Sequence, residues 1–525
     1  MIMRLFTVLL LCLLITANTA YDSDQMWMEN IKMSNVSCPP HPDTIKPLPS
    51  PLPDSISNAI QAAQNIFGDL VSPSKVPGVV VGIRYMDQTW TKGFGTMDVD
   101  TPTVTPDGDA IFRIASITKV FTVLMLYQLY EQGRVKSLDD PITHYCPEFS
   151  LRNPYTLDDV VTLRQLASQL SGLPHASPCY NGTVSNNTCP LKTTEILERL
   201  RKHYRNFPSW TKPSYSDLAY SLLGQCLIQK AYPGMKYETY IEKHILQPLE
   251  MINTGFEFND DVVSKMATGY IAGGENAPLI DLGWDAPSGQ MYSTINDLLK
   301  LSDFFNSVYI PTGSASKILE PHLVRDMASP IYLNNDGKSL FGAPWEMMFV
   351  DTYLVRTKSG SILGYSSQFS FAPDLGLGIV VLVNTNVNLE SDIEGAYKAI
   401  IPAFKELLIA QAGKFPAPTD PNIYTGNYTS VQLSSDTVRI YMKDDILFAD
   451  LRLTDGTNTF FFSPILKYYD DYELQVYVDP NQMTCLLGEL VALDGAWMYF
   501  DKPDNSGKSP GFYFSWLGHQ MNRSG

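Results

Sequence analysis

A serine and a lysine stand one helical turn apart at the start of a long apolar run. Ser116-Ile-Thr-Lys119 leads directly into the segment 120–129, whose length and composition predict a buried helix. A lysine is costly there, because charged side chains are rarely buried without a partner. Residues i and i+3 share a helix face, so the amine of Lys119 can reach the hydroxyl of Ser116. Free backbone N–H groups at the helix start also favour negative charge. The pattern predicts a nucleophile with its base beside it.

The same Ser-x-x-Lys spacing occurs elsewhere, and the neighbouring residues distinguish the matches. The pairs starting at Ser72 and Ser209 lie beside prolines, and the pair starting at Ser314 lies in a Gly/Ser-rich turn. Among these matches, Ser116 alone opens a long apolar run. We therefore take Ser116 as the candidate nucleophile.

Two further motifs follow downstream, and together the three resemble a known superfamily. Tyr215-Ser-Asp217 precedes an apolar run, and Lys358-Ser359-Gly360-Ser361 follows later. This order resembles the serine beta-lactamase and penicillin-binding-protein superfamily, whose signatures are Ser-x-x-Lys, Tyr/Ser-x-Asn and Lys/His-Thr/Ser-Gly. Within it, the chain most resembles the secreted or membrane-associated beta-lactamase-like proteins of animals. Secondary signatures of the superfamily extend the resemblance over residues 57–410; they are the segments 162–173, 286–289, 293–298 and 364–367.

The resemblance implies a catalytic role for four residues. Ser116 would attack an acyl carbon, while Lys119 and the phenol of Tyr215 would share the proton transfers. Lys358 would hold the proton network of Tyr215 or a substrate carboxylate. A buried amine flanked by other cations is expected to have a lowered pKa, which suits a general base. Water would then release the acyl group, with Tyr215 as the base.

The strand carrying Lys358 is expected to bind the substrate and its oxyanion. By carry-over from the superfamily, the backbone N–H groups of Ser116 and Ser361 would form the oxyanion hole, with Ser359 and Gly360 beside it. Singly, each residue also has an ordinary structural explanation, such as helix capping for Ser116.

Asp217 departs from the superfamily pattern, which often has Asn at this position. A carboxylate cannot donate a hydrogen bond to a substrate carbonyl, and would instead pair with Lys119 or Lys358. Gln169 also replaces a His often found before the Ser-Gly-Leu turn, at a position that need not be catalytic. Beta-lactam recognition is therefore doubtful, and an ester, a peptide or another amide is the better expectation.

The first twenty residues are typical of a secretory signal. Arg4 precedes an apolar stretch over 5–15 and small residues up to Ala20, although Asn18 makes the cleavage pattern imperfect and leaves an uncleaved signal anchor as the alternative. We therefore expect a secreted, extracellular protein. Candidate glycosylation sequons fit this compartment; they lie at Asn35, Asn181, Asn186, Asn427 and Asn522.

Six cysteines outside the signal also fit an oxidising compartment. Cys179 and Cys189 flank a polar loop and are predicted to form a local disulfide. Pairing of the other four cannot be read from the sequence, and a buried free thiol is the alternative for Cys226 in its apolar run. These four are Cys38, Cys146, Cys226 and Cys485.

Composition restricts the partners of the chain. The 525 residues carry a net charge of −17, which argues against nucleic acid and anionic membranes because both require basic patches. This charge mainly indicates solubility, with steering of cationic substrates as the alternative. The seven histidines form no His-x-x-x-His pair and no Cys-x-x-Cys occurs, so no metal or cofactor is expected. The expected partner is a small-molecule or peptide acyl substrate, with a membrane only if the signal is retained.

Composition and hydrophobic pattern divide the chain into several regions. The signal 1–20 is followed by a Pro-rich extension over 21–56 and a catalytic domain over 57–412. A linker over 413–421 leads to a β-rich module over 422–525, where short alternating strands surround a run of three phenylalanines. Aromatic residues at strand spacing are expected to be core rather than ligand contacts.

The expected fold class is α/β (α+β). The resemblance implies an antiparallel sheet flanked by helices, with an all-α inserted region, and the pattern adds a C-terminal all-β domain. The expected function is hydrolysis of an ester or amide bond through an acyl-enzyme on Ser116. The alternatives are an inactive binding or assembly protein, which Asp217 favours, and a receptor or adhesion role of the β-module.

Overall fold

The chain divides into two compact units, one ending at Ala412 and one continuing from Gly413. The computed structural model describes residues 47–72, 75–155, 160–179, 189–309, 318–411, 415, 418–455, 458–478 and 493–524. Several sequence predictions fall outside these residues: the signal over 1–20, most of the Pro-rich extension, Cys38, Cys485, Asn35, Asn181 and Asn186.

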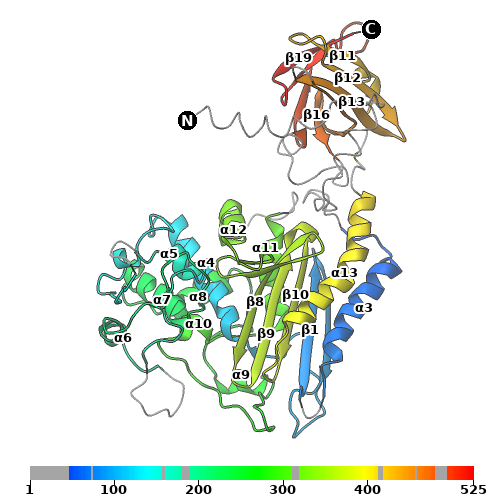
Figure 1. Ribbon diagram of the computed structural model, residues 1–525. Helices are drawn as coiled ribbons and strands as arrows, with labels where there is room; N and C mark the ends of the chain where they lie inside the picture. Colours follow the sequence, from blue (N-terminus) through cyan, green and yellow to red (C-terminus); the bar gives the residue numbers. More distant parts are fainter. Residues whose placement is uncertain are drawn as a thin grey trace, which may run out of the picture. The chain divides into compact units, whose positions relative to one another are not determined.

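An antiparallel sheet of eight strands forms the centre of the first unit (Figure 1). The strand order is β2-β1-β10-β9-β8-β7-β6-β5. This sheet confirms the antiparallel sheet that the resemblance implied. The strands are β1 (Gly78–Tyr85), β2 (Gln88–Gly95), β5 (Tyr332–Leu333), β6 (Ser339–Phe341), β7 (Glu346–Val350), β8 (Tyr353–Ile362), β9 (Tyr365–Ala372) and β10 (Leu377–Val383).

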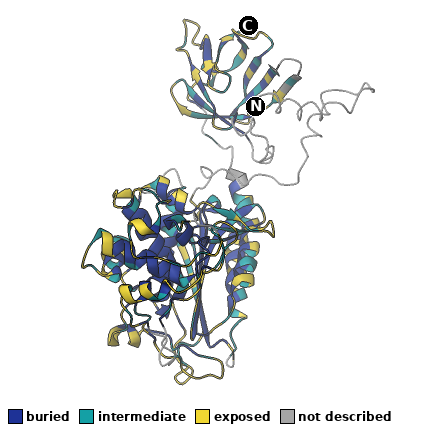
Figure 2. Cartoon of the chain, turned by 60° about the vertical axis from the view of Figure 1, so that its left-hand side comes forward, coloured by how far each residue is buried: buried dark blue, intermediate teal, exposed yellow. Residues whose placement is uncertain are grey.

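Both faces of this sheet are covered by helices, which explains why its central strands are apolar throughout. α3 (Asp54–Gly68) and α13 (Glu390–Gln411) pack together on one face, where Val79 and Val81 of β1 join their core. Val80 points to the opposite face and joins the core of the helical region, because successive side chains of a strand alternate. The resulting buried layers are visible in Figure 2.

One helix on the second face lies unusually close to the sheet. A Cβ added at Gly82 of β1 would lie 2.3 Å from Ile295, and one added at Gly378 of β10 would lie 1.8 Å from the Ser302 hydroxyl. Ile295 and Ser302 belong to α11 (Ile295–Ser307). The two glycines therefore allow α11 to pack directly against the strands.

The region inserted between β2 and β5 is mainly helical and contains one short two-stranded ladder, β3 (Phe112–Arg113) with β4 (Tyr292–Ser293). Its α4 (Thr118–Glu131) is buried from Thr118 to Leu129, as expected for a helix that is apolar all round. The remaining helices are α5 (Leu163–Ala167), α6 (Thr193–Leu200), α7 (Asp217–Ala231), α8 (Tyr237–Ile241), α9 (Asp260–Ser264), α10 (Ala286–Gly289) and α12 (Pro321–Met327).

The second unit is an all-β barrel, which confirms the predicted β-rich module. β14 pairs with β13 alone, and the other eight strands close a ring because β12 also pairs with β13. The strands are β11 (Gly426–Ser430), β12 (Thr437–Lys443), β13 (Ile446–Asp455), β14 (Asn458–Phe462), β15 (Ile465–Asp470), β16 (Glu473–Tyr477), β17 (Trp497–Phe500), β18 (Gly511–Phe514) and β19 (His519–Arg523).

Side chains fill the barrel interior. Phe500, Phe512 and Phe514 are buried in its core, as predicted for aromatic residues at strand spacing, whereas Phe461 in the run of three is exposed. The β12–β13 turn contains Asp444 and Asp445, both at positive φ, as a two-residue hairpin loop of the primed type requires.

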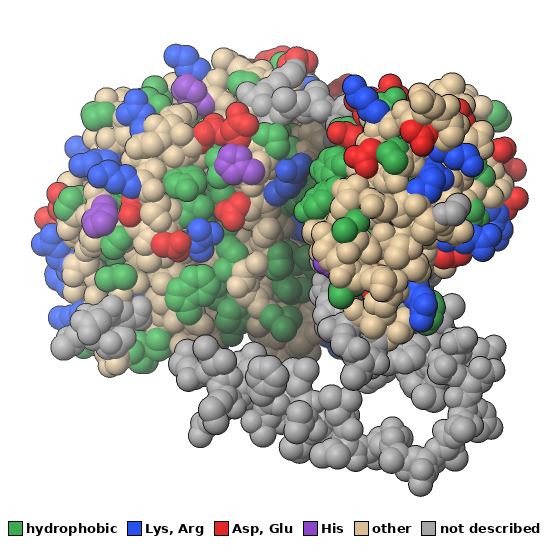
Figure 3. Space-filling model, turned by 90° about the horizontal axis from the view of Figure 1, so that it is seen from above, with side chains coloured by type: hydrophobic (Ala, Val, Ile, Leu, Met, Phe, Trp, Pro, Cys, Tyr) green, Lys and Arg blue, Asp and Glu red, His purple; other side chains and the backbone are tan. Residues whose placement is uncertain are grey.

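The surface carries charges of both signs. On the face shown in Figure 3, Lys and Arg side chains are scattered among Asp and Glu rather than gathered into one patch. Within the described ranges, no helix is long and apolar enough to cross a membrane. Asn427 and Asn522 are exposed on the barrel, and their glycosylation stays a prediction.

Candidate active site

Ser116 lies in a short 3-10 turn, η2 (Ala115–Ile117), that runs straight into α4. The residue before it, Ala115, has a φ of +45°, a backbone conformation that is strained for a residue with a side chain. The carbonyl of Ile114 is fixed by the Ser367 hydroxyl at 2.8 Å. The backbone leading to Ser116 is therefore held in one conformation by the fold around it.

Lys119 lies in the first turn of α4 and uses all three of its donors. Its Nζ lies 2.9 Å from the Oγ of Ser116, 2.6 Å from Asp217 and 2.7 Å from the carbonyl oxygen of Ser288 in α10. Burial opposes the charged form, but neighbouring Tyr215 and Asp217 outweigh it and raise the pKa of Lys119. The expected lowering of this pKa is wrong, because that expectation weighed burial and neighbouring cations and left out the effect of Tyr215 and Asp217, which both raise the pKa.

Tyr215 stands just outside the start of α7 and reaches the same serine. Its hydroxyl lies 2.7 Å from the Oγ of Ser116. The helix begins here because Ser216 is its N-cap and accepts a hydrogen bond from the backbone N–H of Ala219. Tyr215 is therefore the last residue before a fixed helix end.

Gln169 holds this segment from both sides. Its side-chain oxygen accepts from the backbone N–H of Ser216 at 2.7 Å, and its carbonyl accepts from Ser214 at 2.8 Å. Gln169 itself is buried and has a φ of +65°. The structure thus gives Gln169 a positioning role for Tyr215, which the sequence comparison with His did not reveal.

Asp217 occupies the first turn of α7, where a carboxylate interacts favourably with the helix dipole. One oxygen pairs with Lys119, as the sequence allowed, and the other lies 3.6 Å from the Nε2 of His175. The His175 carbonyl also accepts from the backbone N–H of Asp217 at 2.8 Å. His175 is exposed beside the site and was not among the predicted site residues.

Lys358 lies on β8 and is also completely buried. Its Nζ is 2.5 Å from the Oε1 of Glu346, and the other carboxylate oxygen of Glu346 accepts from the backbone N–H of Ser359 at 3.2 Å. The ring of Tyr215 has Lys119 and Lys358 at 4.9 and 5.3 Å from its centre. Two ammonium groups therefore flank one phenol.

The end of β8 presents a free edge to the site. β7 pairs with β8 only up to Glu346 opposite Thr357, so the segment 358–362 is unpaired on that side. The Ser359 N–H points to this side, since it reaches Glu346. Strand geometry repeats every two residues, so the Ser361 N–H points the same way. The Ser361 N–H therefore lies on the edge of β8 that β7 leaves unpaired.

Gly360 lets β8 approach the turn that holds the serine. A Cβ at this position would lie 2.3 Å from the carbonyl oxygen of Ile114 and 2.3 Å from the hydroxyl of Ser367. A side chain here would therefore push the strand away from η2. This close approach explains why a glycine stands at position 360 of the Lys-Ser-Gly motif.

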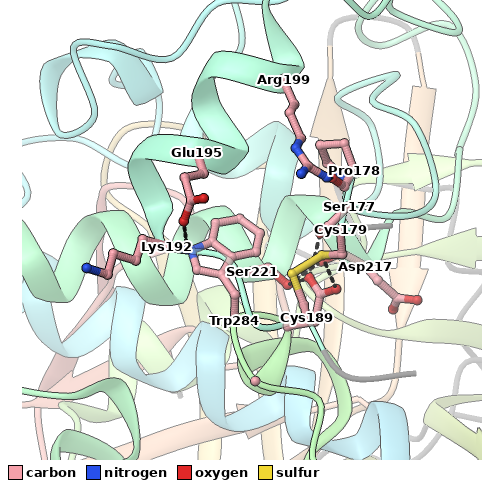
Figure 4. Close-up of a disulfide and its surroundings, with 12 residues drawn as sticks. Ser177, Pro178, Cys179, Cys189, Lys192, Glu195, Arg199, Asp217, Ser221 and Trp284 are labelled. Atoms are coloured by element: carbon pink, nitrogen blue, oxygen red, sulfur yellow. Dashed lines mark hydrogen bonds between the residues drawn. A yellow bond between two sulfur atoms is a disulfide. The ribbon is translucent and has the colours of Figure 1, made fainter. Parts of the chain in front are cut away.

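A disulfide lies close to the site and confirms the predicted pairing of Cys179 with Cys189. Figure 4 shows it beside Ser177 and Ser221, with Asp217 nearby. Half-buried Asp285 accepts from both serines, at 2.5 and 2.8 Å, and desolvation raises its pKa. Cys179, Cys189 and Asp285 are also the one group in the described residues with the spacing of metal ligands, but their sulfurs are bonded to each other.

Cys146 and Cys226 are buried free thiols. Their mutual hydrogen bond, together with burial, raises the pKa of Cys226. This arrangement agrees with the alternative given for Cys226, a thiol buried in an apolar helix.

Hydrogen bonds join Tyr215 to Ser116, Ser116 to Lys119 and Lys119 to Asp217, and Lys358 lies next to Tyr215. Sequence reasoning missed Glu346 and His175, and it named Gln169 without its role in positioning Tyr215. The register of the β7–β8 hairpin is the signal that could have found Glu346, because it places this residue opposite Thr357, one position before Lys358.

Comparison with known proteins identifies the family. The model of the beta-lactamase family matches residues 63–402. A human protein named "Putative beta-lactamase-like 1" is 32% identical over 501 residues, covering 90% of this chain and 96% of its own. "Beta-lactamase-like protein 2" of Dictyostelium discoideum is 31% identical, covering 74% of this chain and 70% of its own.

Solved structures agree on the fold. The octameric penicillin-binding protein homologue from Pyrococcus abyssi is 21% identical, with a TM-score of 0.53, and the match covers 88% of this chain and 99% of that one. A beta-lactamase/D-alanine carboxypeptidase from Yersinia pestis is 24% identical, with a TM-score of 0.56, covering 67% and 98%. These structures show the shared fold, and the family model together with the human relative shows that the chain belongs to the beta-lactamase family.

Proposed function

We propose that this protein is a secreted serine hydrolase that cleaves an ester or amide bond through an acyl-enzyme on Ser116. The observation that carries the proposal is the pair of short contacts at the serine oxygen, 2.9 Å from Lys119 and 2.7 Å from Tyr215. A hydroxyl held between an amine and a phenol can lose its proton as it attacks.

The raised pKa of Lys119 indicates that its ammonium form predominates, so we assign proton acceptance to the phenolate form of Tyr215. The ammonium groups of Lys119 and Lys358 would offset the phenolate charge. The Oγ of Ser116 bonds to the acyl carbon while its proton passes to Tyr215. The phenol then protonates the leaving alcohol or amine as its bond to carbon breaks.

Deacylation reverses these roles with water. Tyr215 takes a proton from the water that attacks the acyl carbon, and Ser116 leaves with a proton returned from Tyr215. The backbone N–H groups of Ser116 and Ser361 would stabilise the oxyanion in both steps. The free edge of β8 supports this assignment for Ser361.

The extracellular location is part of the same proposal. The sequence features of the signal predict export, and the Cys179–Cys189 disulfide supports an oxidising compartment. Retention of the signal as an anchor would place the same unit on the outer side of a membrane.

Labelling with a fluorophosphonate probe tests the proposal. We expect the purified protein to be labelled at Ser116, and the Ser116→Ala variant to lose the label. Ser72→Ala is the matched control, because Ser72 begins another Ser-x-x-Lys sequence in a different context. Intact-mass mapping locates the adduct, and folding of each variant is checked by circular dichroism.

The alternative is an inactive binding or assembly protein that kept the fold. Asp217 favours it, since this carboxylate engages Lys119 where the family often has an amide. Absence of labelling in a demonstrably folded wild-type protein would select this alternative over the hydrolase.

A further inference from the structure

In the candidate site the positive charges are buried and the negative charges are partly exposed. The side chains of Lys119 and Lys358 are 0% exposed, whereas the carboxylates that pair with them, Asp217 and Glu346, are 32% and 30% exposed. An incoming substrate therefore meets the carboxylates before it meets either ammonium group. The site is balanced in charge, but the accessible charge is negative.

The two lysines also have few hydrogen-bond donors left for a substrate. A lysine ammonium has three donors, and those of Lys119 reach Ser116, Asp217 and Ser288. Lys119 consequently has no donor left for a substrate carboxylate. Lys358 gives two donors, to Glu346 at 2.5 Å and to the Ser359 carbonyl at 3.0 Å, and its charge is already matched.

The two carboxylates retain acceptor capacity. An ionised carboxylate offers about four lone-pair positions. Asp217 uses one oxygen for Lys119, while its other oxygen lies 3.6 Å from His175, which is longer than a hydrogen bond. A substrate group that donates hydrogen bonds or carries positive charge is the complement of this arrangement, and a substrate carboxylate would be repelled.

We propose that the site selects acyl substrates with a cationic group close to the scissile bond and discriminates against those with a carboxylate there. This inference rests on the hydrolase function proposed above and specifies its substrate class. The chain's net charge of −17 acts in the same direction, because a negative protein field attracts cations over distance.

A series of isosteric esters tests the selection. Each is a 4-nitrophenyl ester whose short acyl chain ends in trimethylammonium, in tert-butyl or in carboxylate, so that the first two differ in charge and not in shape. The acylation rate constant is measured from nitrophenolate release and from competition with fluorophosphonate labelling of Ser116. We expect the cationic ester to react about tenfold faster than the neutral one, and the carboxylate ester at least about tenfold slower.

Two charge-neutralising variants locate the source of the selection. Asp217→Asn and Glu346→Gln keep the side-chain shape, and we expect each to reduce the ratio of cationic to neutral acylation rates by several-fold, up to about tenfold. Asp351→Asn is the matched control, because Asp351 pairs with Lys405 outside the site and its loss changes the net charge equally. This control should keep the wild-type ratio.

The outcomes separate the selection from the hydrolase function. A carboxylate ester that reacts as fast as the neutral ester, or a ratio unchanged in both site variants, overturns the selection while labelling of Ser116 still supports the hydrolase. No labelling and no acylation of folded wild-type protein overturn both. A ratio that falls equally in Asp351→Asn would assign the effect to overall charge and overturn the role of Asp217 and Glu346.

Discussion

The two units of this protein differ in what they bury. The first unit buries two lysines completely, Lys119 and Lys358, and both contribute to one site. In the described part of the barrel, the buried polar side chains are Ser430, Asp436 and Ser509, while the interior is filled by apolar and aromatic groups. Buried charge is costly, so two buried ammonium groups that flank one tyrosine mark that point as functional. In the barrel, buried Asp436 accepts a hydrogen bond from the backbone N–H of Thr454, which is a structural contact.

Removing a buried charge should produce the largest effect. We expect Lys119→Met to reduce the rate of fluorophosphonate labelling at least about a thousandfold, because Ser116 loses its amine contact. We also expect the free energy of unfolding of the first unit to fall by about 3 kcal/mol, because Asp217 is left uncompensated. Labelling kinetics and denaturant titration measure the two effects.

The control for this prediction is an exposed lysine of the same unit. Lys398 pairs with Glu394 on the surface of α13, and Lys398→Met should change stability by less than about 1 kcal/mol. The double variant Lys119→Met with Asp217→Leu should recover most of the lost stability without recovering labelling. Wild-type labelling by Lys119→Met would show that the buried charge of the first unit is as dispensable as the surface pair.

The close approach of β8 to the serine turn predicts the second effect. We expect Gly360→Ala to reduce the labelling rate about a hundredfold, because the new methyl group would displace the strand from the Ile114 carbonyl and misplace the Ser361 N–H. Gly395→Ala in α13 is the control, because a Cβ there would make ordinary contact with Ile66 at 3.5 Å. Equal labelling rates in the two variants would contradict the steric role of Gly360.

Some residues of the candidate site could be predicted from the sequence, and others could not. Ser116 and Lys119 are close because of helical spacing, so local pattern was sufficient. Glu346 acts through the register of the β7–β8 hairpin, and Gln169 acts through a loop held at positive φ; helical spacing indicates neither. The same limit explains the pKa of Lys119, whose direction depends on neighbours brought in by α7.

The barrel shows this limit on a larger scale. The short alternating strands predicted an all-β module, and the structure confirms it. Closure of the ring requires β11 to pair with β19, a strand at the other end of the module. No local pattern specifies such a contact, so the sequence predicted the strands but not their closure into a barrel.

The barrel offers its own test through one arginine of β19. Arg523 donates to the carbonyls of Ile423, Thr425 and Ser509 and to the hydroxyl of Tyr428. We expect Arg523→Met to lower the unfolding free energy of the barrel by about 2 kcal/mol, because buried acceptors lose their donor. Labelling of Ser116 should be unchanged. A fall in labelling that matches the loss of barrel stability would show that the site depends on the second unit.

The smallest expected effect is a loss of folding stability at alkaline pH, which can be measured in both units. The pKa of Lys119 is raised from 10.5, so the folded state holds this proton more tightly than the unfolded state does. Burial raises the pKa of Tyr428 in the barrel from 10.0 to about 12, with Arg523 opposing, and again the folded state holds the proton. Folding keeps Lys119 as a cation and Tyr428 as a neutral phenol, and in both cases deprotonation at high pH lowers stability. Both units should lose stability as pH rises above about 10.

Calorimetry at about pH 9 and about pH 11 measures this loss, with the barrel transition identified by its shift in Arg523→Met. We expect Lys119→Met to reduce the pH dependence of the first unit alone, and Tyr428→Phe to reduce that of the barrel alone. Buried tyrosines of the first unit such as Tyr237 and Tyr397 also have raised pKa values, so part of the slope should remain in Lys119→Met. A slope as steep in Lys119→Met as in the wild-type protein would mean that this amine holds its proton equally in the folded and unfolded states. The Lys119–Asp217 pair would then be no tighter than a surface ion pair, and the difference in buried charge between the units would lose its energetic basis.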